Sequence, residues 1–129
     1  MRGPIRILLV EDNEVFRETL ELLLGMRADV EVVASVGDGN DAVPACRRYR
    51  PDVVLMDYRL PGLDGVQATA AVRAACPDTA VVCLTASIHP REGDALIEAG
   101  AVACLSKNQE LDAIVAAIHH AAGREAAWS

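Results

Sequence analysis

Asp52-Val53-Val54-Leu55-Met56-Asp57 is an apolar run that ends in a carboxylate, and a Pro61-Gly62 pair follows it closely. Such a run without polar residues is typical of a strand that is covered on both faces of a parallel sheet. The Pro-Gly pair suits the centre of a type II turn, where glycine supplies the positive φ. The stretch therefore predicts a buried strand that ends at the Asp57 carboxylate and leads into a turn.

Four other apolar runs of strand length occur along the chain, and the segments between the runs read as helices. The predicted strands are residues 5–10, 30–36, 53–56, 80–84 and 102–105. Strands that alternate with helices indicate an α/β fold, in which helices cover both faces of a parallel sheet. We therefore expect a flavodoxin-like, doubly wound sheet of five parallel strands in the order 2-1-3-4-5, with five helices.

Spacing and capping signals support individual helices. Apolar residues in the segment 111–118 recur at the i, i+3, i+4, i+7 spacing of one buried helical stripe. Pro44 fits a helix only in the first turn, which makes Asp41 the expected N-cap of the second helix. Gly100 stands where the end of the fourth helix needs a left-handed residue.

The composition describes one globular domain of 129 residues, of which 52% are hydrophobic. A net charge of −7 opposes the phosphate neutralisation that non-specific nucleic-acid binding requires, so we expect no direct nucleic-acid contact by this segment. No apolar stretch is long enough to span a membrane, and the N-terminus leads into a strand instead of a signal-peptide core. We expect a cytoplasmic protein without membrane contact.

The cysteines and histidines show no metal-binding pattern. The cysteines have no CxxC pair, and we expect free thiols that behave as small buried hydrophobic residues. The histidines lack ligand spacing, and we expect solvated side chains. These residues are Cys46, Cys76, Cys83 and Cys104, and His89, His119 and His120.

Polar residues stand at the ends of four predicted strands. Glu11 and Asp12 follow the first strand, and Asp57 follows the third. Thr85 follows the fourth strand, and Lys107 lies just beyond the fifth. In open parallel sheets the ligand crevice lies beyond the carboxyl ends of the strands, where the strand order reverses. The sequence therefore predicts one site that these residues share.

Three carboxylates at that point would repel one another and raise one another's pKa unless a cation lies among them. Oxygen donors without His or Cys favour Mg²⁺ over Zn²⁺. A nucleotide or flavin cofactor is disfavoured, because the loop of residues 10–14 is acidic and has no Gly, Ser or Thr for a phosphate. With Mg²⁺ bound, Asp57 can attack a phosphoryl group while Lys107 and Thr85 stabilise its oxygens.

Several motifs carry a resemblance to a known family. They are Glu11-Asp12, Asp57, Leu60-Pro61-Gly62-Leu63-Asp64-Gly65, Thr85-Ala86, Ala99-Gly100-Ala101 and Lys107. In this order they resemble the receiver domain of two-component response regulators, over the whole chain. The type that precedes a LuxR-type helix-turn-helix output domain is the most similar. The resemblance assigns residues 1–122 to a receiver domain and residues 123–129, which include Trp128, to a tail or the start of a linker.

The resemblance implies a phosphorylation-dependent signalling domain and not an enzyme. Asp57 would accept a phosphoryl group from the phosphohistidine of a sensor histidine kinase. Asp12 and Asp57 would bind Mg²⁺ directly, and Glu11 would act through water. The backbone carbonyl of Arg59 would complete the protein ligands.

The resemblance also implies how the signal would be read. Lys107 would pair with Asp57 and later with the phosphoryl oxygens, and Thr85 would hydrogen-bond the phosphoryl group. The change would shift a two-state equilibrium on the face formed by the fourth helix, the fifth strand and the fifth helix. That face would control transcription through a DNA-binding domain outside this chain, with a homodimer among the partners that the family allows.

Four positions bear on this resemblance. Cys104 stands where receivers usually carry a Tyr or Phe whose ring turns inward, so the aromatic part of the switch is missing; we expect a buried strand residue there. Asn108 replaces a Pro that often follows the lysine, so the next loop could take another path. Arg59 and Ser87 flank the route of the water that hydrolyses the acyl phosphate in this family.

Two other functions remain open. A Mg²⁺-dependent aspartyl phosphohydrolase also places an Asp at a strand end, but such enzymes usually carry a second Asp two residues later, where this chain has Arg59. A receiver-like module that binds proteins without phosphorylation has the same size and fold. Cys104 favours that module, whereas the full set of polar residues at the strand ends argues against it.

Overall fold

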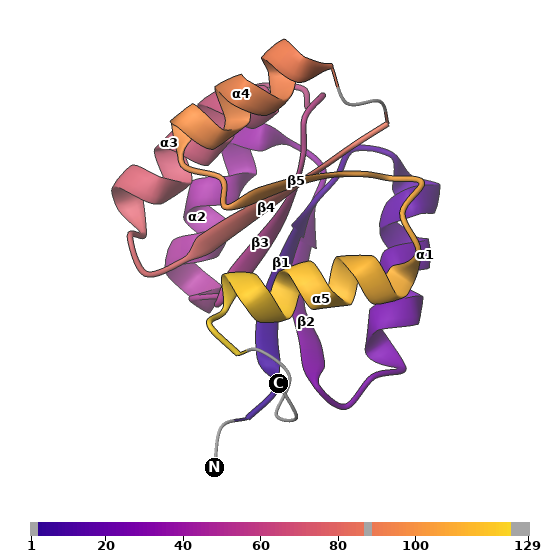
Figure 1. The fold of residues 1–129 in the computed structure, drawn as a ribbon. Helices are drawn as coiled ribbons and strands as arrows, with labels where there is room; N and C mark the ends of the chain where they lie inside the picture. Colours follow the sequence, from indigo (N-terminus) through magenta and orange to yellow (C-terminus); the bar gives the residue numbers. More distant parts are fainter. Residues whose placement is uncertain (1–2, 87–88, 125–129) are drawn as a thin grey trace.

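The computed structural model describes residues 3–86 and 89–124, so Ser87 and the tail residues 125–129, Trp128 among them, lie outside the described residues. Strands and helices alternate as the sequence predicts (Figure 1). The strands are β1 (Ile5–Val10), β2 (Val30–Val36), β3 (Val53–Asp57), β4 (Ala80–Thr85) and β5 (Ala103–Ser106). The helices are α1 (Glu14–Gly25), the short 3₁₀ helix η1 (Gly39–Asp41), α2 (Ala42–Tyr49), α3 (Gly65–Ala75), α4 (Pro90–Ala99) and α5 (Leu111–Ala121).

The five strands form one parallel sheet in the order β2-β1-β3-β4-β5, which confirms the predicted topology. Two strands extend one residue beyond their predicted ends, so that Asp57 and Thr85 are the last residues of β3 and β4. The fifth strand was predicted one residue too early. Its ladder with β4 runs from Ala103 to Ser106, whereas Val102 precedes it and is 49% exposed.

Helices cover both faces of the sheet (Figure 1). Helices α1 and α5 pack on one face, where Ile7 and Leu9 of β1 point. Helices α2, α3 and α4 pack on the other face, toward which Leu8 and Val10 point. Alternate residues of one strand thus contribute to two separate cores, as the pleat requires. No helix in the described part of the chain is long and apolar enough to cross a membrane.

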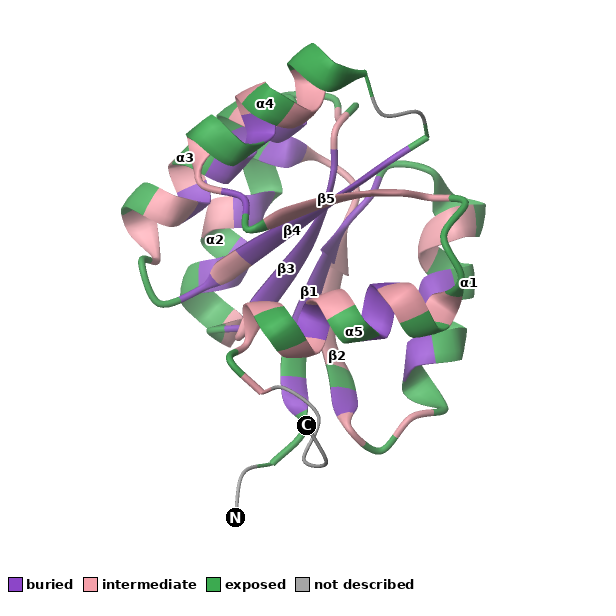
Figure 2. Cartoon of the chain, viewed as in Figure 1, coloured by how far each residue is buried: buried purple, intermediate pink, exposed green. Residues whose placement is uncertain are grey.

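The sheet is buried unevenly (Figure 2). Every residue of β3 is buried, because β1 and β4 flank it and helices cover both of its faces. Every residue of β5 is only half-buried, because this strand forms one edge of the sheet. The strand that ends in Asp57 is therefore the most enclosed one, whereas the strand that leads to Lys107 is close to solvent.

Two turns of the fold depend on glycines, one of them beside the site and one at the opposite edge of the sheet. Gly62 has φ 79° and Gly100, the C-cap of α4, has φ 116°, so both occupy the left-handed region that the sequence predicted for them. A Cβ on Gly62 would also collide with the side chain of Asp38. Close by, the Gly39 amide donates to the Pro61 carbonyl at 3.0 Å. The loop after Asp57 is thus fastened to the loop after β2.

The helix ends agree in part with the sequence. Asp41 is the N-cap of α2, as predicted, and Pro44 lies in the first turn. The Asp41 side chain makes no capping hydrogen bond, since η1 already leads into the helix. Helix α3 is capped more fully, because Asp64 and Gln67 form a reciprocal capping box.

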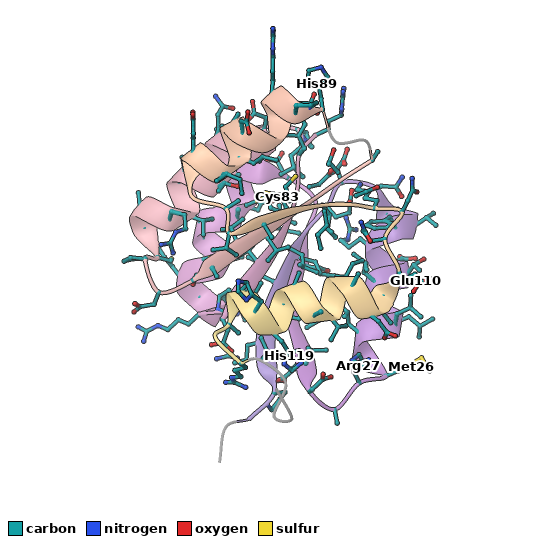
Figure 3. The ribbon with its side chains drawn as sticks, viewed as in Figure 1. Met26, Arg27, Cys83, His89, Glu110 and His119 are labelled. Atoms are coloured by element: carbon teal, nitrogen blue, oxygen red, sulfur yellow. The ribbon has the colours of Figure 1, made fainter. Side chains whose placement is uncertain are left out.

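One histidine departs from its predicted solvated state. His119 Nε2 lies 2.8 Å from Asp29 Oδ2, and Asp29 also binds Arg27 at 2.9 Å. The Arg27 hydrogen bond is the main cause that lowers the pKa of Asp29 to about 2. Figure 3 shows His119 on α5 and Arg27 after α1. The contact joins segments far apart in the chain, so local spacing could not reveal it.

The cysteines are free thiols, as predicted, but their burial is mixed. Cys46 and Cys83 are buried, and desolvation is the main cause that raises the pKa of each thiol to about 12. Cys76 and Cys104 are only half-buried, so the prediction of full burial was wrong for them. Cys76 caps the end of α3, and Cys104 lies on the edge strand, where no outer strand covers it.

Candidate functional site

Asp57 is held at the carboxyl edge of the sheet by the strands around it. It pairs with Leu84 in the β3–β4 ladder, and the residue is only 6% exposed. The backbone N–H of Arg59 donates to Asp57 Oδ1 at 3.4 Å. Directly after Asp57, the Tyr58 carbonyl accepts from the Gly65 amide at 2.8 Å, which fixes the start of α3 beside it. The Asp57 carboxylate is therefore buried in a fixed position.

Glu11 and Asp12 reach the same point from the end of β1. The Glu11 amide donates to the Val36 carbonyl at 3.0 Å, so the start of the acidic loop is still hydrogen-bonded to the end of β2. Glu11 is 4% exposed, whereas Asp12 is exposed. Glu11, Asp12 and Asp57 each offer an oxygen, and these oxygens lie within 4.8 Å of one another. The structure thus brings the three carboxylates together.

Lys107 lies between two of these carboxylates. Its Nζ is 2.5 Å from Glu11 Oε1 and 3.4 Å from Asp57 Oδ2. The Lys107 side chain is 15% exposed, and its ammonium also lies 4.7 Å from the centroid of the Phe16 ring. A cation over an aromatic face is attracted by the ring's electrons. The ammonium is thus fixed by two acids and one ring.

Thr85 stands at the end of β4, where it is 4% exposed. Its backbone carbonyl accepts a hydrogen bond from the Lys107 amide at 2.8 Å. Thr85 also pairs with Ser106 in the β4–β5 ladder. The residue that carries the hydroxyl and the residue that carries the ammonium are thus joined through their backbones.

The electrostatics of the cluster favour an added positive charge. Burial, and then the hydrogen bond and charge of Glu11, raise the pKa of Asp57 to about 7, and Lys107 only partly opposes this. One ammonium does not compensate three neighbouring carboxyl groups. Either a proton or a cation is needed to make the cluster stable near neutral pH.

The donor set fits a hard divalent cation. The three groups are carboxylates, and no thiol or imidazole belongs to the cluster. Mg²⁺ binds oxygen donors and keeps several waters, so an exposed Asp12 beside a buried Asp57 suits it. Glu11, Asp12 and Asp57 are therefore the residues that would hold the ion.

Arg59 and Cys104, which were also named from the sequence, occupy different environments. Arg59 is exposed, and its amide faces Asp57; the role of its carbonyl as a metal ligand remains a prediction. Cys104 lies on β5 beside Cys83 of β4 and packs against the core under α2, α3 and α4. Burial, and then the charge of Glu92, raise the pKa of its thiol.

Sequence reasoning missed two contributors to the site. Phe16 on α1 covers the Lys107 ammonium, and Arg17 Nη1 donates to the Glu11 carbonyl at 2.8 Å. Both lie in the first turn of the helix that follows the acidic loop, and Phe16 is the only Phe of the chain. Their position one turn beyond Glu11-Asp12 was a usable signal, since a helix N-terminus faces back toward the loop before it.

The fold and the site together define a class of protein. The doubly wound parallel sheet is that of a flavodoxin-like α/β domain. Its acidic cluster and lysine lie at the switch point between β1 and β3, which is the edge where such sheets bind ligands. The family model of the response regulator receiver domain matches residues 7–119. The chain belongs to this family, as the sequence motifs indicated, and is thus a response regulator domain of two-component systems.

Relatives and solved structures agree with this assignment. The transcriptional regulatory protein DegU of Brevibacillus brevis is 37% identical over 118 residues, which are 90% of this chain and 49% of that protein. The receiver domain of the response regulator NarL of Mycobacterium tuberculosis is 33% identical with a TM-score of 0.90, over 95% of this chain and 98% of that chain.

A third similar protein indicates the subfamily. A LuxR-family two-component response regulator from Aurantimonas sp. SI85-9A1 is 30% identical with a TM-score of 0.86, over 95% of this chain and 89% of that chain. The chain spans about half the length of the curated relatives that it matches. Its relatives thus include transcriptional regulatory proteins and a response regulator of the LuxR family.

Proposed function

We propose that Asp57 accepts a phosphoryl group from a sensor histidine kinase in a Mg²⁺-dependent reaction. The observation that carries this proposal is the cluster itself, with carboxylate oxygens of Glu11, Asp12 and Asp57 within 4.8 Å of one another and Lys107 at 3.4 Å from Asp57. A buried carboxylate beside a cation site and an ammonium has the groups that phosphoryl transfer to an aspartate requires.

The transfer replaces one bond to phosphorus with another. An Asp57 carboxylate oxygen forms a bond to phosphorus while the bond from phosphorus to the kinase imidazole nitrogen breaks, and the imidazole keeps the electron pair. The product is an acyl phosphate. Bound Mg²⁺, held by Glu11, Asp12 and Asp57, would supply positive charge for the phosphoryl oxygens.

The protein residues around Asp57 supply the other positive and polar groups. Lys107 loses part of its contact with Glu11 when it turns toward the phosphoryl oxygens, and the Phe16 ring keeps the ammonium near the site. Thr85 donates its hydroxyl to the phosphoryl group. Because the Lys107 amide is bound to the Thr85 carbonyl, movement of one residue shifts the other.

The output surface that we propose is the face of α4, β5 and α5. Strand β5 is half-buried along its whole length and directly precedes Lys107. Ile97 of α4 and Val102 just before β5 are each 49% exposed, so the segments that form or border this face expose apolar side chains. Its partner would be a second copy of the chain or a DNA-binding output domain of the LuxR type.

The test is the intact mass of the protein after treatment with acetyl phosphate and Mg²⁺. Wild type should gain one phosphoryl group, about 80 Da, whereas Asp57→Asn and a sample with excess EDTA should not. Circular dichroism of each variant verifies the fold. Unmodified wild type would favour a binding module without phosphorylation, and sustained turnover of p-nitrophenyl phosphate would favour a phosphohydrolase.

A further inference from the structure

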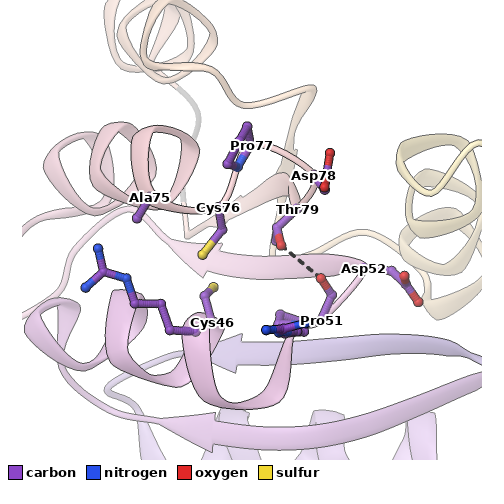
Figure 4. A pocket seen from close by; sticks show the side chains of 10 residues that line it. Cys46, Pro51, Asp52, Ala75, Cys76, Pro77, Asp78 and Thr79 are labelled. Carbon is purple, nitrogen blue, oxygen red and sulfur yellow. Dashed lines mark hydrogen bonds between the residues drawn. The ribbon is translucent and has the colours of Figure 1, made fainter.

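A pocket at the opposite edge of the sheet brings two cysteines together. Its volume is about 490 Å³, and it lies between the end of α2 and the segment that joins α3 to β4. Cys46 and Cys76 both line it. Figure 4 shows their sulfur atoms pointing toward one another from the two sides. Two thiols that face each other can be joined without a large backbone movement, provided that their Cβ atoms also converge.

The backbone of both cysteines is hydrogen-bonded, and the Cys46 carbonyl accepts from the Arg50 amide at 2.8 Å. The Cys76 amide donates to the Val72 carbonyl at 2.7 Å, and the Thr79 hydroxyl donates to the Pro51 carbonyl at 2.9 Å (Figure 4). Arg73 Nη1 donates to the Thr79 carbonyl at 2.6 Å. These bonds hold the segment that carries Cys76 against the start of β3. The facing thiols are therefore part of a fixed structure.

The two thiols differ in access, and this difference sets their chemistry. Cys46 is 1% exposed, whereas Cys76 is half-buried and opens on the pocket. Arg47 and Arg50 also line the pocket, beside the two cysteines. Cys76 is thus the thiol that an oxidant reaches first, and Cys46 is the thiol placed to resolve it.

We propose that Cys46 and Cys76 form a reversible disulfide when the chain meets a hydroperoxide. The Cys76 thiolate attacks the hydroperoxide, breaks its O–O bond and becomes a sulfenic acid, while the alcohol or water leaves with the other oxygen. The Cys46 sulfur then attacks the Cys76 sulfur, and the sulfenic oxygen leaves as water. The two thiols lose two electrons in total, and the hydroperoxide gains them.

The crosslink fastens α2 to the end of α3, far from the acidic site. Cys76 lies near the start of β4, whereas Asp57 and Thr85 lie at the far ends of β3 and β4. Five residues of strand separate the two edges by about 16 Å. Disulfide formation is therefore independent of the proposed phosphorylation, and either one can fail without the other.

The test oxidises the reduced wild-type chain with a small excess of hydrogen peroxide, followed by alkylation of the remaining thiols. We expect two alkylated cysteines in place of the four in the reduced protein, and a mass lower by about 2 Da before alkylation. Trypsin with a protease that cleaves before aspartate should give residues 41–47 linked to residues 74–77, because Asp78 separates Cys76 from Cys83. Dithiothreitol should release the link.

Matched variants separate this pair from the other two cysteines. Cys76→Ser should remain fully reduced at Cys46, whereas Cys104→Ser should still form the link. Oxidation should raise the melting temperature of wild type by roughly 5 °C and leave that of Cys76→Ser unchanged. Circular dichroism verifies that each variant folds.

Three outcomes would overturn the proposal. Both thiols could stay free in a folded wild-type chain, Cys76 could oxidise to a sulfinic acid without a partner, or the link could join Cys83 to Cys104. The last two cysteines are neighbours across the β4–β5 ladder, so they are the relevant competing pair.

Discussion

Strands β3 and β5 belong to one parallel sheet and both lead to the candidate site, but they differ in how firmly they are held. All residues of β3 are buried between β1 and β4, and β3 ends in Asp57. All residues of β5 are half-buried at the edge of the sheet, and β5 leads to Lys107. The carboxylate that we propose as the acceptor is therefore fixed at the centre of the sheet, whereas the ammonium lies next to its edge strand.

This difference suits a signalling domain. A buried strand keeps the acceptor carboxylate in one place, so that a cation and a donor can approach it in a constant geometry. An edge strand has fewer apolar contacts and opens locally at a lower free energy than the core. A conformational change needs less free energy where the structure is least constrained. The proposed output face includes β5, which is such a segment.

The largest expected effect compares one leucine on each strand. Leu55→Ala on β3 should lower the free energy of unfolding by about 3 kcal/mol, because Leu55 is 2% exposed and its removal leaves a cavity. Leu105→Ala on β5 should cost only about 1 kcal/mol, because Leu105 is half-buried. Urea denaturation of both variants measures the difference. Equal losses would show that the two strands are held equally.

The next effect concerns the ammonium that β5 presents to the site. Lys107→Gln should slow phosphorylation by acetyl phosphate roughly a hundredfold, because the phosphoryl oxygens lose a charged donor. Lys107→Arg keeps the charge and should recover part of the rate. The rate is measured as the growth of the phosphorylated mass with time. A wild-type rate in Lys107→Gln would exclude a role for this side chain in the transfer.

The contrast between the two strands also shows what the sequence could and could not predict. The apolar runs, the turn glycine Gly62 and the order of strands followed from local patterns and from the rules of parallel sheets. The apolar run of β5 did not by itself show half-burial, because a short apolar run looks the same at the edge of a sheet as at its centre; only the predicted strand order placed it at an edge. Its first predicted residue, Val102, proved to lie outside the strand.

The candidate site, too, could be predicted only in part from the sequence. Placing Glu11, Asp12 and Asp57 at one edge needed only the strand ends and the topology. The resemblance implied that Lys107 pairs with Asp57, and the structure has this ion pair at 3.4 Å together with a shorter one to Glu11 at 2.5 Å. Side-chain conformation decides between two acids at similar range, and no spacing rule encodes it. The Phe16 ring over the ammonium was missed although its place in the first turn of α1, next to the acidic loop, was a usable signal.

A third prediction uses the pKa of Asp57, which burial and Glu11 raise to about 7. An unfolded aspartate titrates at about 3.9, so between these values the folded chain holds a proton that the unfolded chain has released. Without Mg²⁺ the free energy of unfolding should therefore fall with rising pH, by up to about 1.4 kcal/mol per pH unit from this group.

The control for this prediction is Asp57→Asn, which lacks the titrating group. The difference in unfolding free energy between wild type and Asp57→Asn should be constant below about pH 4 and change steadily from there toward pH 7, as wild type loses stability. Added Mg²⁺ should stabilise wild type near pH 7, because the ion replaces the proton among the carboxylates. Denaturation curves that keep the same difference at every pH would contradict the raised pKa.

The smallest effect concerns Cys104, where the family resemblance leads us to expect an aromatic ring. Cys104→Tyr should change the free energy of unfolding by less than about 1 kcal/mol, since the residue is half-buried on the edge strand and a larger side chain can extend to solvent. Cys104→Ala serves as the control for loss of the thiol. A loss above about 2 kcal/mol would show that β5 is packed as tightly as β3.

The central claim is that β3 presents Asp57, and no other carboxylate, to a phosphoryl donor. The same strand provides an internal comparison, because Asp52 stands just before it and Asp57 ends it. Both lie in the tryptic peptide of residues 49–59, so fragmentation of that peptide after borohydride reduction identifies the modified residue. With acetyl phosphate and Mg²⁺ we predict conversion of Asp57 alone to homoserine. Modification of Asp52, of another acid, or of none in the folded chain would contradict the account.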